Sequence, residues 1–176
     1  MAGRYPESDP PRSRMAEKDR LLRELAAARE ALLRSVQGLT ADQMKEPGAE
    51  GPAWSAQDVL GHIAAWERQT LEAVRAHLAG TTPYRIEGFD SLADRDEWNQ
   101  LAVEERRNWP VHEVLVELGV VRNELLAHLA GLSEVQLNDW MVYPWGKRGR
   151  LSRLLQLGVD HEREHAATLA AWRGRS

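Results

Sequence analysis

Residues 161 to 165 read HEREH, which matches the HExxH pattern of zinc proteases. Two histidines four residues apart on a helix project side by side, as two ligands of one metal ion must. In such proteases the glutamate acts as general base, so Glu162 is the candidate for that role here. The motif therefore predicts a metal site with two imidazole ligands on one helix.

A third imidazole is available from an earlier helix. On a helical wheel, His161 and His165 share the apolar face of the last predicted helix, while His62 lies at the edge of an apolar arc, beside Trp66. Alternatively, each histidine is a core residue with its own hydrogen-bond partner. Because an unsatisfied buried imidazole costs about 1–3 kcal/mol, one shared purpose is the simpler explanation for three of them. Three inward histidines from two helices leave coordination positions open for water or substrate, as catalytic sites require.

The protease hypothesis fails because the motif has no further ligand downstream. Zinc proteases of this type complete their site with another Glu or His, but the segment after His165 reads AATLAAWRGRS. The sequence also offers no candidate edge strand that would align a peptide. We therefore treat the match to HExxH as incidental and zinc protease as the third hypothesis.

Composition narrows the remaining classes of function. The 176 residues contain no cysteine, which excludes thiolate nucleophiles and leaves His, Asp and Glu as metal ligands. With a net charge of −4, the sequence lacks the excess of basic residues that nucleic-acid binding usually requires, so we expect no nucleic-acid partner. No apolar run is long enough for a membrane span, and no secretory signal is evident. A cytoplasmic protein with no membrane association is the expectation.

Helical periodicity and capping signals predict the elements that position these residues. We expect a disordered, proline-rich tail over residues 1–14 and a single domain over 15–176. The segments GLTADQM and GLSEVQL repeat the same capping signal after the first and third long helices. The fold class is all-α, a four-helix bundle in which residues 81–107 form a long helical crossover. The predicted helices cover 16–37, 56–80, 92–107, 111–130 and 151–173, with short turns after Gly38 and Gly131.

Several residues near the histidines are candidates for a supporting shell or a pocket. Asp58 and Asp160 could orient a ligand imidazole, although Asp58 is more simply the acidic residue of a capping box with Ser55. Loop tryptophans line a pocket mouth or, as a simpler alternative, plug the ends of the bundle. The pocket candidates are Trp54, Trp66, Trp98, Asn99, Trp140, Tyr143 and Trp145.

Five stretches together resemble the DinB-like superfamily of four-helix bundle proteins. WSAQDVLGHIAAWE (54–67) resembles the family's Trp-Ser start of helix two with its inward His62, and HEREHAATLAAW (161–172) resembles its C-terminal HxxxH helix. The repeated GL[ST]xxQ segments and the crossover sequence WNQLAVEERRNWP look most similar to the ClbS/DfsB-type branch. The resemblance covers about residues 16–173.

The resemblance implies an up-down-down-up bundle, a divalent metal (zinc or nickel) on His62, His161 and His165, and frequent homodimers. It also implies a small-molecule substrate, because family members include thiol-dependent S-transferases and isomerases and hydrolases that give self-resistance to reactive natural products. This chain departs from the family by having Ala166, Ala167 and Thr168 where a Gly-Gln pair is common, which disfavours a specific assignment as a thiol transferase. The leading hypothesis is a metal-dependent hydrolase or transferase acting on a small electrophile. The alternative is a non-catalytic protein that binds and sequesters a small molecule, or a stress-resistance protein of ClbS/DfsB type.

Overall fold

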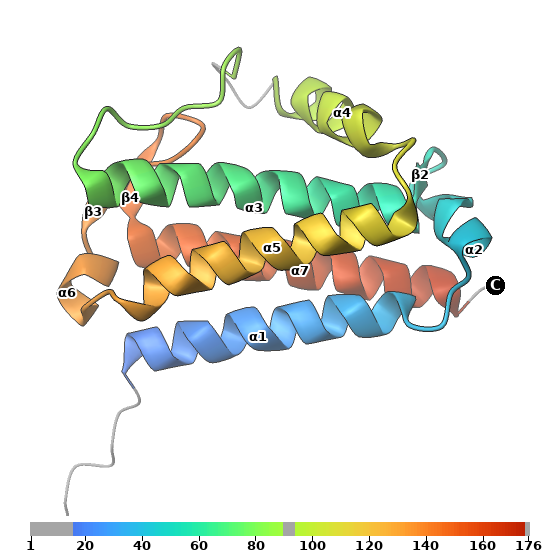
Figure 1. The fold of residues 1–176 in the computed structure, drawn as a ribbon, viewed down its shortest axis with the longest axis horizontal. Helices are drawn as coiled ribbons and strands as arrows, with labels where there is room; N and C mark the ends of the chain where they lie inside the picture. Colours follow the sequence, from blue (N-terminus) through green and yellow to red (C-terminus); the bar gives the residue numbers. More distant parts are fainter. Residues whose placement is uncertain (1–15, 90–93, 175–176) are drawn as a thin grey trace, which may run out of the picture.

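The computed structural model, which describes residues 16–89 and 94–174, is built around four long helices lying side by side (Figure 1). The chain runs in one direction through the first and last of them and in the opposite direction through the middle two. The predicted up-down-down-up topology is therefore confirmed. The tail predicted over residues 1–14 lies outside the described residues. The four helices are α1 (Glu17–Val36), α3 (Ala56–Ala79), α5 (Val111–Ala130) and α7 (Leu151–Arg173).

Local capping chemistry sets the boundaries of α3, the helix that carries His62. The Ser55 side chain accepts a hydrogen bond from the Asp58 backbone N–H, and the Asp58 carboxylate accepts one from the Ser55 N–H, which completes a capping box. At the other end, Gly80 adopts the left-handed conformation with φ of 65°. The capping box and the end of the helix near residue 80 agree with the prediction, and the boundaries of all four long helices lie within a residue of their predicted positions.

The segments GLTADQM and GLSEVQL, which carry the repeated capping signal, form short capped helices. Thr40 with Gln43 caps α2 (Ala41–Lys45), and Ser133 with Gln136 caps α6 (Glu134–Leu137), each through a complete capping box. They stand at opposite ends of the bundle in Figure 1. Each one redirects the chain from a long helix toward a loop that packs against the start of the next.

The loops that precede α3 and α7 contain two small β-hairpins, which the sequence did not predict. β1 (Pro47–Glu50) pairs antiparallel with β2 (Trp54–Ser55), and β3 (Trp140–Val142) pairs antiparallel with β4 (Arg148–Arg150). Strands of two to four residues are too short to show an alternating pattern, so periodicity alone predicted loops there. Both hairpins lead directly into a helix that carries candidate ligands.

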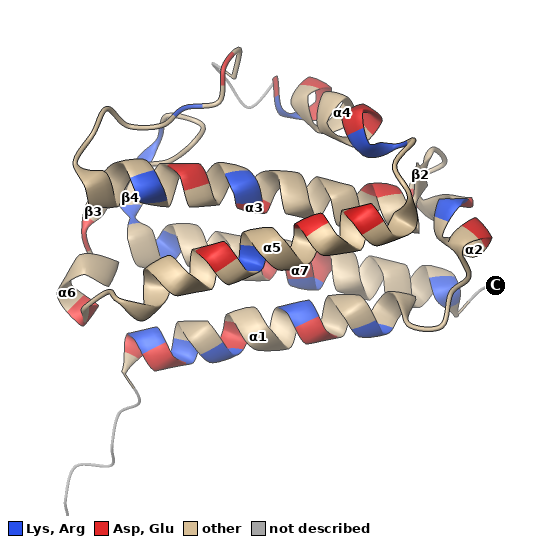
Figure 2. Ribbon diagram, viewed as in Figure 1, with Lys and Arg blue, Asp and Glu red and all other residues tan. Residues whose placement is uncertain are grey.

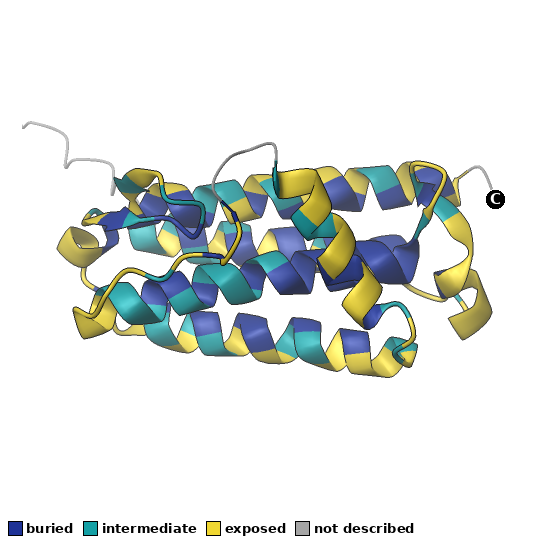
Figure 3. Cartoon of the chain, turned by 90° about the horizontal axis from the view of Figure 1, so that it is seen from above, coloured by how far each residue is buried: buried dark blue, intermediate teal, exposed yellow. Residues whose placement is uncertain are grey.

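The crossover between α3 and α5 returns along the outside of the bundle. Its helix, α4 (Arg95–Arg106), packs on α3, with an exposed outer face (Figure 3). The predicted helix began near residue 92, but residues 90–93 are not described. Residues 55–65 of the chain are buried without interruption, because α4, the first hairpin, α5 and α7 all pack around this part of α3. His62 lies within this buried stretch.

A layer of four charged side chains divides the interior into two apolar halves. Each long helix contributes one member, and apolar core residues lie on both sides of it along every helix. Elsewhere acidic and basic residues are interspersed along α1 and α3 (Figure 2). None of the described helices is long and apolar enough to cross a membrane. The members of this buried charged layer are Arg29, Glu67, Arg122 and Glu162.

Candidate metal centre

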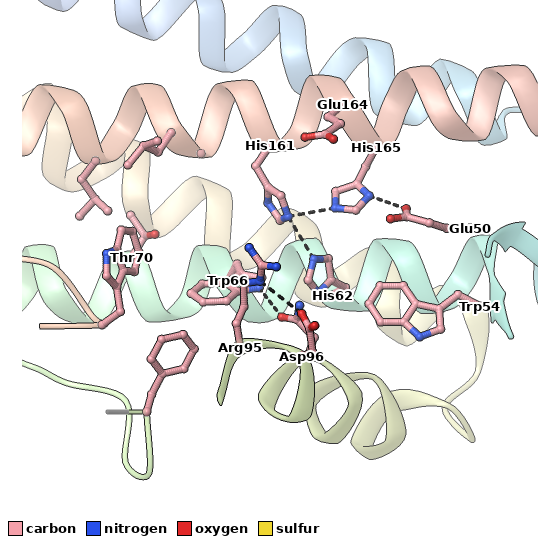
Figure 4. A pocket seen from close by; sticks show the side chains of 16 residues that line it. Glu50, Trp54, His62, Trp66, Thr70, Arg95, Asp96, His161, Glu164 and His165 are labelled. Atoms are coloured by element: carbon pink, nitrogen blue, oxygen red, sulfur yellow. Dashed lines mark hydrogen bonds and ion pairs between the residues drawn. The ribbon is translucent and has the colours of Figure 1, made fainter. Parts of the chain in front are cut away.

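Three histidine side chains from two helices converge on one point. His62 Nε2 lies 3.0 Å from His161 Nε2, which lies 2.9 Å from His165 Nε2. His62 comes from α3 and the other two come from successive turns of α7, so the antiparallel packing of these helices brings them together (Figure 4). His62 and His165 are buried and His161 is half-buried. The described residues contain one cluster of potential metal ligands, and it is the set predicted from the sequence.

The three nitrogens fit a divalent ion better than they fit one another. A neutral imidazole nitrogen carries either a hydrogen or a lone pair, so His161 Nε2 cannot make a good hydrogen bond to both neighbours. Three lone pairs directed at one ion remove this conflict. Two imidazole nitrogens that each lie about 2.0–2.1 Å from the same ion are roughly 3 Å apart, as are the nitrogens of the His62–His161 and His161–His165 pairs. Three protein ligands also leave positions open, which is the pattern of catalytic sites.

Two of the histidines, His62 and His161, are held in the neutral form that metal binding requires. Burial, followed by the neighbouring His161 and His165, lowers the pKa of His62 from 6.5 to about 2. Burial, His165 and Arg95 lower the pKa of His161 to about 4, against an opposing effect of Glu50. At neutral pH both rings therefore offer a lone pair without first losing a proton.

Glu50 is a site residue that the sequence did not reveal. Its Oε2 lies 2.5 Å from His165 Nδ1, so the carboxylate accepts the Nδ1 hydrogen and leaves Nε2 as the lone-pair nitrogen. Glu50 ends β1, and the β1–β2 hairpin places it against α7. A glutamate in a Pro- and Gly-rich segment carries no recognisable signal before the hairpin is known.

The His62 ring is oriented by packing. Its centroid lies 5.0 Å from that of Trp54, on β2. Within the described residues, His62 Nδ1 is buried and has no hydrogen-bond partner. The structure thus fixes His165 through a carboxylate and His62 through an aromatic contact.

The predicted role of Glu162 as general base does not agree with its environment. The Glu162 side chain is 1% exposed, and its two oxygens accept hydrogen bonds from Arg29 Nε and from Arg122 Nη2, the latter at 2.6 Å. It belongs to the buried charged layer. Successive residues of a helix project about 100° apart, so Glu162 does not share the direction of His161 and His165. It points instead toward Arg29 and Arg122.

The two aspartates considered as orienting groups have other partners. Asp58 caps α3, as the sequence favoured, through its bonds to Ser55. Asp160 accepts a hydrogen bond from Gln156 at 3.0 Å and lies 3.8 Å from Arg153 on the outer face of α7.

A pocket of about 490 Å³ opens beside the histidines, which form part of its wall. Of the predicted pocket residues, Trp54, Trp66, Asn99 and Trp145 line it. Trp98 and Tyr143 stand behind this lining, with ring centroids 4.5 Å from Trp66 and 5.2 Å from Trp145. Trp140 lies elsewhere and is exposed. Residues that the sequence did not single out also line the pocket: Glu50, Thr70, Phe89, Arg95, Asp96 and Glu164.

Solved structures share this architecture at low sequence identity. The colibactin self-resistance protein ClbS, solved in complex with double-stranded DNA, superposes with a TM-score of 0.75 at 17% identity, over 89% of this chain and 95% of its own. DfsB, described as a sibling lethal factor precursor, gives 0.77 at 16% identity, over 90% and 95%. YfiT from Bacillus subtilis, described as a "probable metal-dependent hydrolase with an unusual four-helix bundle topology", gives 0.71 at 20% identity, over 98% and 93%. No curated protein matches the chain.

The comparison with ClbS corrects one expectation. Net charge led us to exclude nucleic acid as a partner, yet a protein of this fold forms a complex with double-stranded DNA. A near-balanced overall charge does not describe the local surface that contacts a phosphate backbone, so the exclusion was wrong.

The sequence itself supplies the assignment to a family. A family model of the DinB superfamily matches residues 24–169, which include α3, α5, most of α1 and α7, and the three histidines. The bundle topology and the two sequence motifs around His62 and His161 agree with that match. The chain belongs to the DinB superfamily.

Proposed function

We propose that this protein is a metal-dependent hydrolase or transferase that acts on a small electrophilic molecule. The observation that supports it is the convergence of three imidazoles in the wall of an open pocket, where His161 Nε2 lies 3.0 Å from His62 Nε2 and 2.9 Å from His165 Nε2. A pocket of this size suits a small molecule. Zinc or nickel as the ion and a homodimeric assembly stay predictions.

Each protein group has a distinct part in this proposal. His62, His161 and His165 would hold the ion through Nε2, and Glu50 would keep His165 in the required tautomer. When bound, the ion supplies Lewis acidity, which polarises a substrate oxygen or lowers the pKa of a bound water molecule to near neutrality. The aromatic walls hold the substrate and limit the access of bulk water.

The rival function is sequestration of a small molecule without turnover. The observation in its favour is the hydrogen bonding of Glu162. Both of its oxygens accept hydrogen bonds from arginines, so they are not available to accept a proton from a nucleophile. A sequestering protein would use the same pocket but would release its ligand chemically unchanged.

Mass spectrometry of a reactive model electrophile separates the two functions. Zinc-loaded protein would be incubated with 4-nitrophenyl acetate, with and without N-acetylcysteine as a thiol acceptor. We expect acetate without the thiol or the acetyl thioester with it, formed faster than with the metal-free protein or with His161→Ala. Recovery of intact ester bound to the protein, or equal rates with and without metal, would contradict an enzymatic role. His112→Ala, at an exposed position of α5, is the matched control.

A further inference from the structure

An aromatic wall stands next to the histidines. Trp66 is its centre, with ring centroids 6.0 Å from Phe89 and 6.1 Å from Trp145. The Trp66 indole is fixed from behind, because Nε1 donates to Asn99 Oδ1 at 2.9 Å and Trp98 packs at 4.5 Å. Because Trp66 comes one helical turn after His62 on α3, this wall directly adjoins the candidate metal centre.

Two loops hold this wall in a preformed shape. Phe89 comes from the segment after α3, and Trp145 from the turn between β3 and β4. The Ile86 N–H donates to the Pro144 carbonyl at 2.9 Å, which joins the two loops. Arg85 packs so closely over Gly146 that a Cβ there would lie 2.5 Å from its Nη2. The aromatic surface is therefore built by the fold and does not depend on a ligand to assemble it.

A cationic side chain also lines the pocket. Arg95, the first residue of α4, belongs to the same lining as Trp66 and His62 (Figure 4). Arg95 Nε donates to Asp96 Oδ1 at 3.3 Å, which uses one of the five N–H donors of the guanidinium. The Asp96 side chain is 83% exposed against 55% for Arg95, so the acid stands further into solvent.

The described pocket lining carries the cation Arg95 and three acids, Glu50, Asp96 and Glu164, and two of these acids, Glu50 and Asp96, are already paired. Glu50, the acid that contacts the cluster, is engaged by His165. The positive charge of Arg95 helps to lower the pKa of His161, and a bound divalent ion would add further positive charge to this side of the pocket. A planar guanidinium in a pocket with aromatic walls suits a carboxylate or sulfonate attached to a flat ring.

We propose that the pocket selects planar, conjugated or aromatic molecules that carry one anionic group. The flat part lies against Trp66 and Trp145, and the anionic group pairs with Arg95. Only the further statement, that the reactive atom then lies beside the three histidines, rests on the proposed function.

Titration calorimetry with three probes of equal size tests this selection. The probes are naphthalene-2-sulfonate, neutral naphthalene-2-methanol and the cation (2-naphthyl)trimethylammonium, each titrated into protein with and without zinc. We expect the sulfonate to bind tightest in both forms. Arg95→Gln should weaken sulfonate binding about tenfold and leave the neutral probe within about twofold, because a charge-assisted hydrogen bond is lost. Trp145→Leu should weaken both about three- to tenfold.

The outcomes separate this proposal from the proposed function. Tightest binding of the cation would indicate an aromatic cage for ammonium groups and overturn the selection of anions. Equal binding of all probes, no binding, or an equal effect of Arg34→Gln, a control on the exposed face of α1, would also overturn it. The titration of metal-free protein needs no ion, so it tests the selection of anions even if the protein fails to bind metal. Metal binding can likewise be tested even if none of the probes binds.

Discussion

At the scale of single residues, the site depends on groups that fix the orientation of its ligands. Glu50 is the clearest case, since its carboxylate contacts the ring nitrogen of His165 opposite to the one in the cluster. Such carboxylates orient a ligand imidazole and raise its basicity. The same residue lies 33% exposed in the pocket wall, so its effect can be measured without opening the core.

Glu50→Gln should therefore lower the affinity for zinc about tenfold to a hundredfold and barely change the thermal unfolding temperature. Competition with a chromophoric chelator measures the affinity, and circular dichroism measures unfolding. Glu30→Gln, which removes an exposed carboxylate on α1, is the control. Unchanged zinc affinity in Glu50→Gln would show that the contact with His165 has no positioning role.

The place of each site residue in the chain decided whether it was predictable. His62, His161 and His165 lie on long helices, where a regular period reports which residues share a face. Glu162 lies on the same helix as two of them, but its partners Arg29 and Arg122 come from helices far away in sequence, so its role could not be read from α7 alone. Glu50 comes from an unpredicted hairpin.

At the scale of elements, the buried charged layer sets how the four helices meet. Glu67 on α3 and Glu162 on α7 each bind Arg29 of α1 and Arg122 of α5, so every long helix is tied to two others. The arginines also donate to backbone carbonyls, Arg29 to Leu118 at 2.7 Å and Arg122 to Leu25 at 2.7 Å. Two members of the layer are neighbours of pocket residues in the sequence, because Glu67 follows Trp66 and Glu162 follows His161.

Breaking this layer should be costly. Glu67→Gln keeps the volume but leaves two buried guanidinium groups facing one carboxylate, so the free energy of unfolding should fall by about 3–5 kcal/mol. Urea denaturation followed by circular dichroism measures it. Loss of the exposed Glu30–Arg34 pair in Glu30→Gln should have little effect on the same measurement. Equal, small effects of the two substitutions would contradict the role assigned to the layer.

The elements themselves were predictable in proportion to their length. The four long helices carry both an apolar period and capping residues, and the structure reproduces their boundaries closely. The hairpins were missed because tertiary contacts, and not a local pattern, make Pro47–Glu50 and Trp140–Val142 extended. The charged layer was missed because no local signal distinguishes a buried arginine from an exposed one.

At the scale of the whole molecule, the histidine cluster links folding to pH in the absence of metal. The pKa values of His62 and His161 in the folded protein lie well below the unfolded value of 6.5. The unfolded chain therefore binds more protons as the pH falls below 6.5, and the folded state loses stability from there toward pH 4. Each histidine contributes up to about 1.4 kcal/mol per pH unit in this range.

Metal-free protein should accordingly unfold at clearly lower urea concentration at pH 5 than at pH 7, with little change between pH 7 and 8. Because carboxylates contribute in the same direction, the informative quantity is the difference from His62→Gln, which should show a shallower dependence between pH 6.5 and 5. An identical pH dependence in the two proteins would contradict the burial of His62 as a neutral ring.

The central claim is that three imidazoles form one metal site, and metal content tests it most directly. Protein purified without a histidine tag would be loaded with zinc or nickel, desalted and measured by inductively coupled plasma mass spectrometry. We predict about one ion per chain in the wild type and in His112→Ala, and less than about a tenth of that in His62→Ala and His161→Ala. A wild-type content below about 0.1 ion per chain, or full occupancy in His62→Ala, would contradict the account.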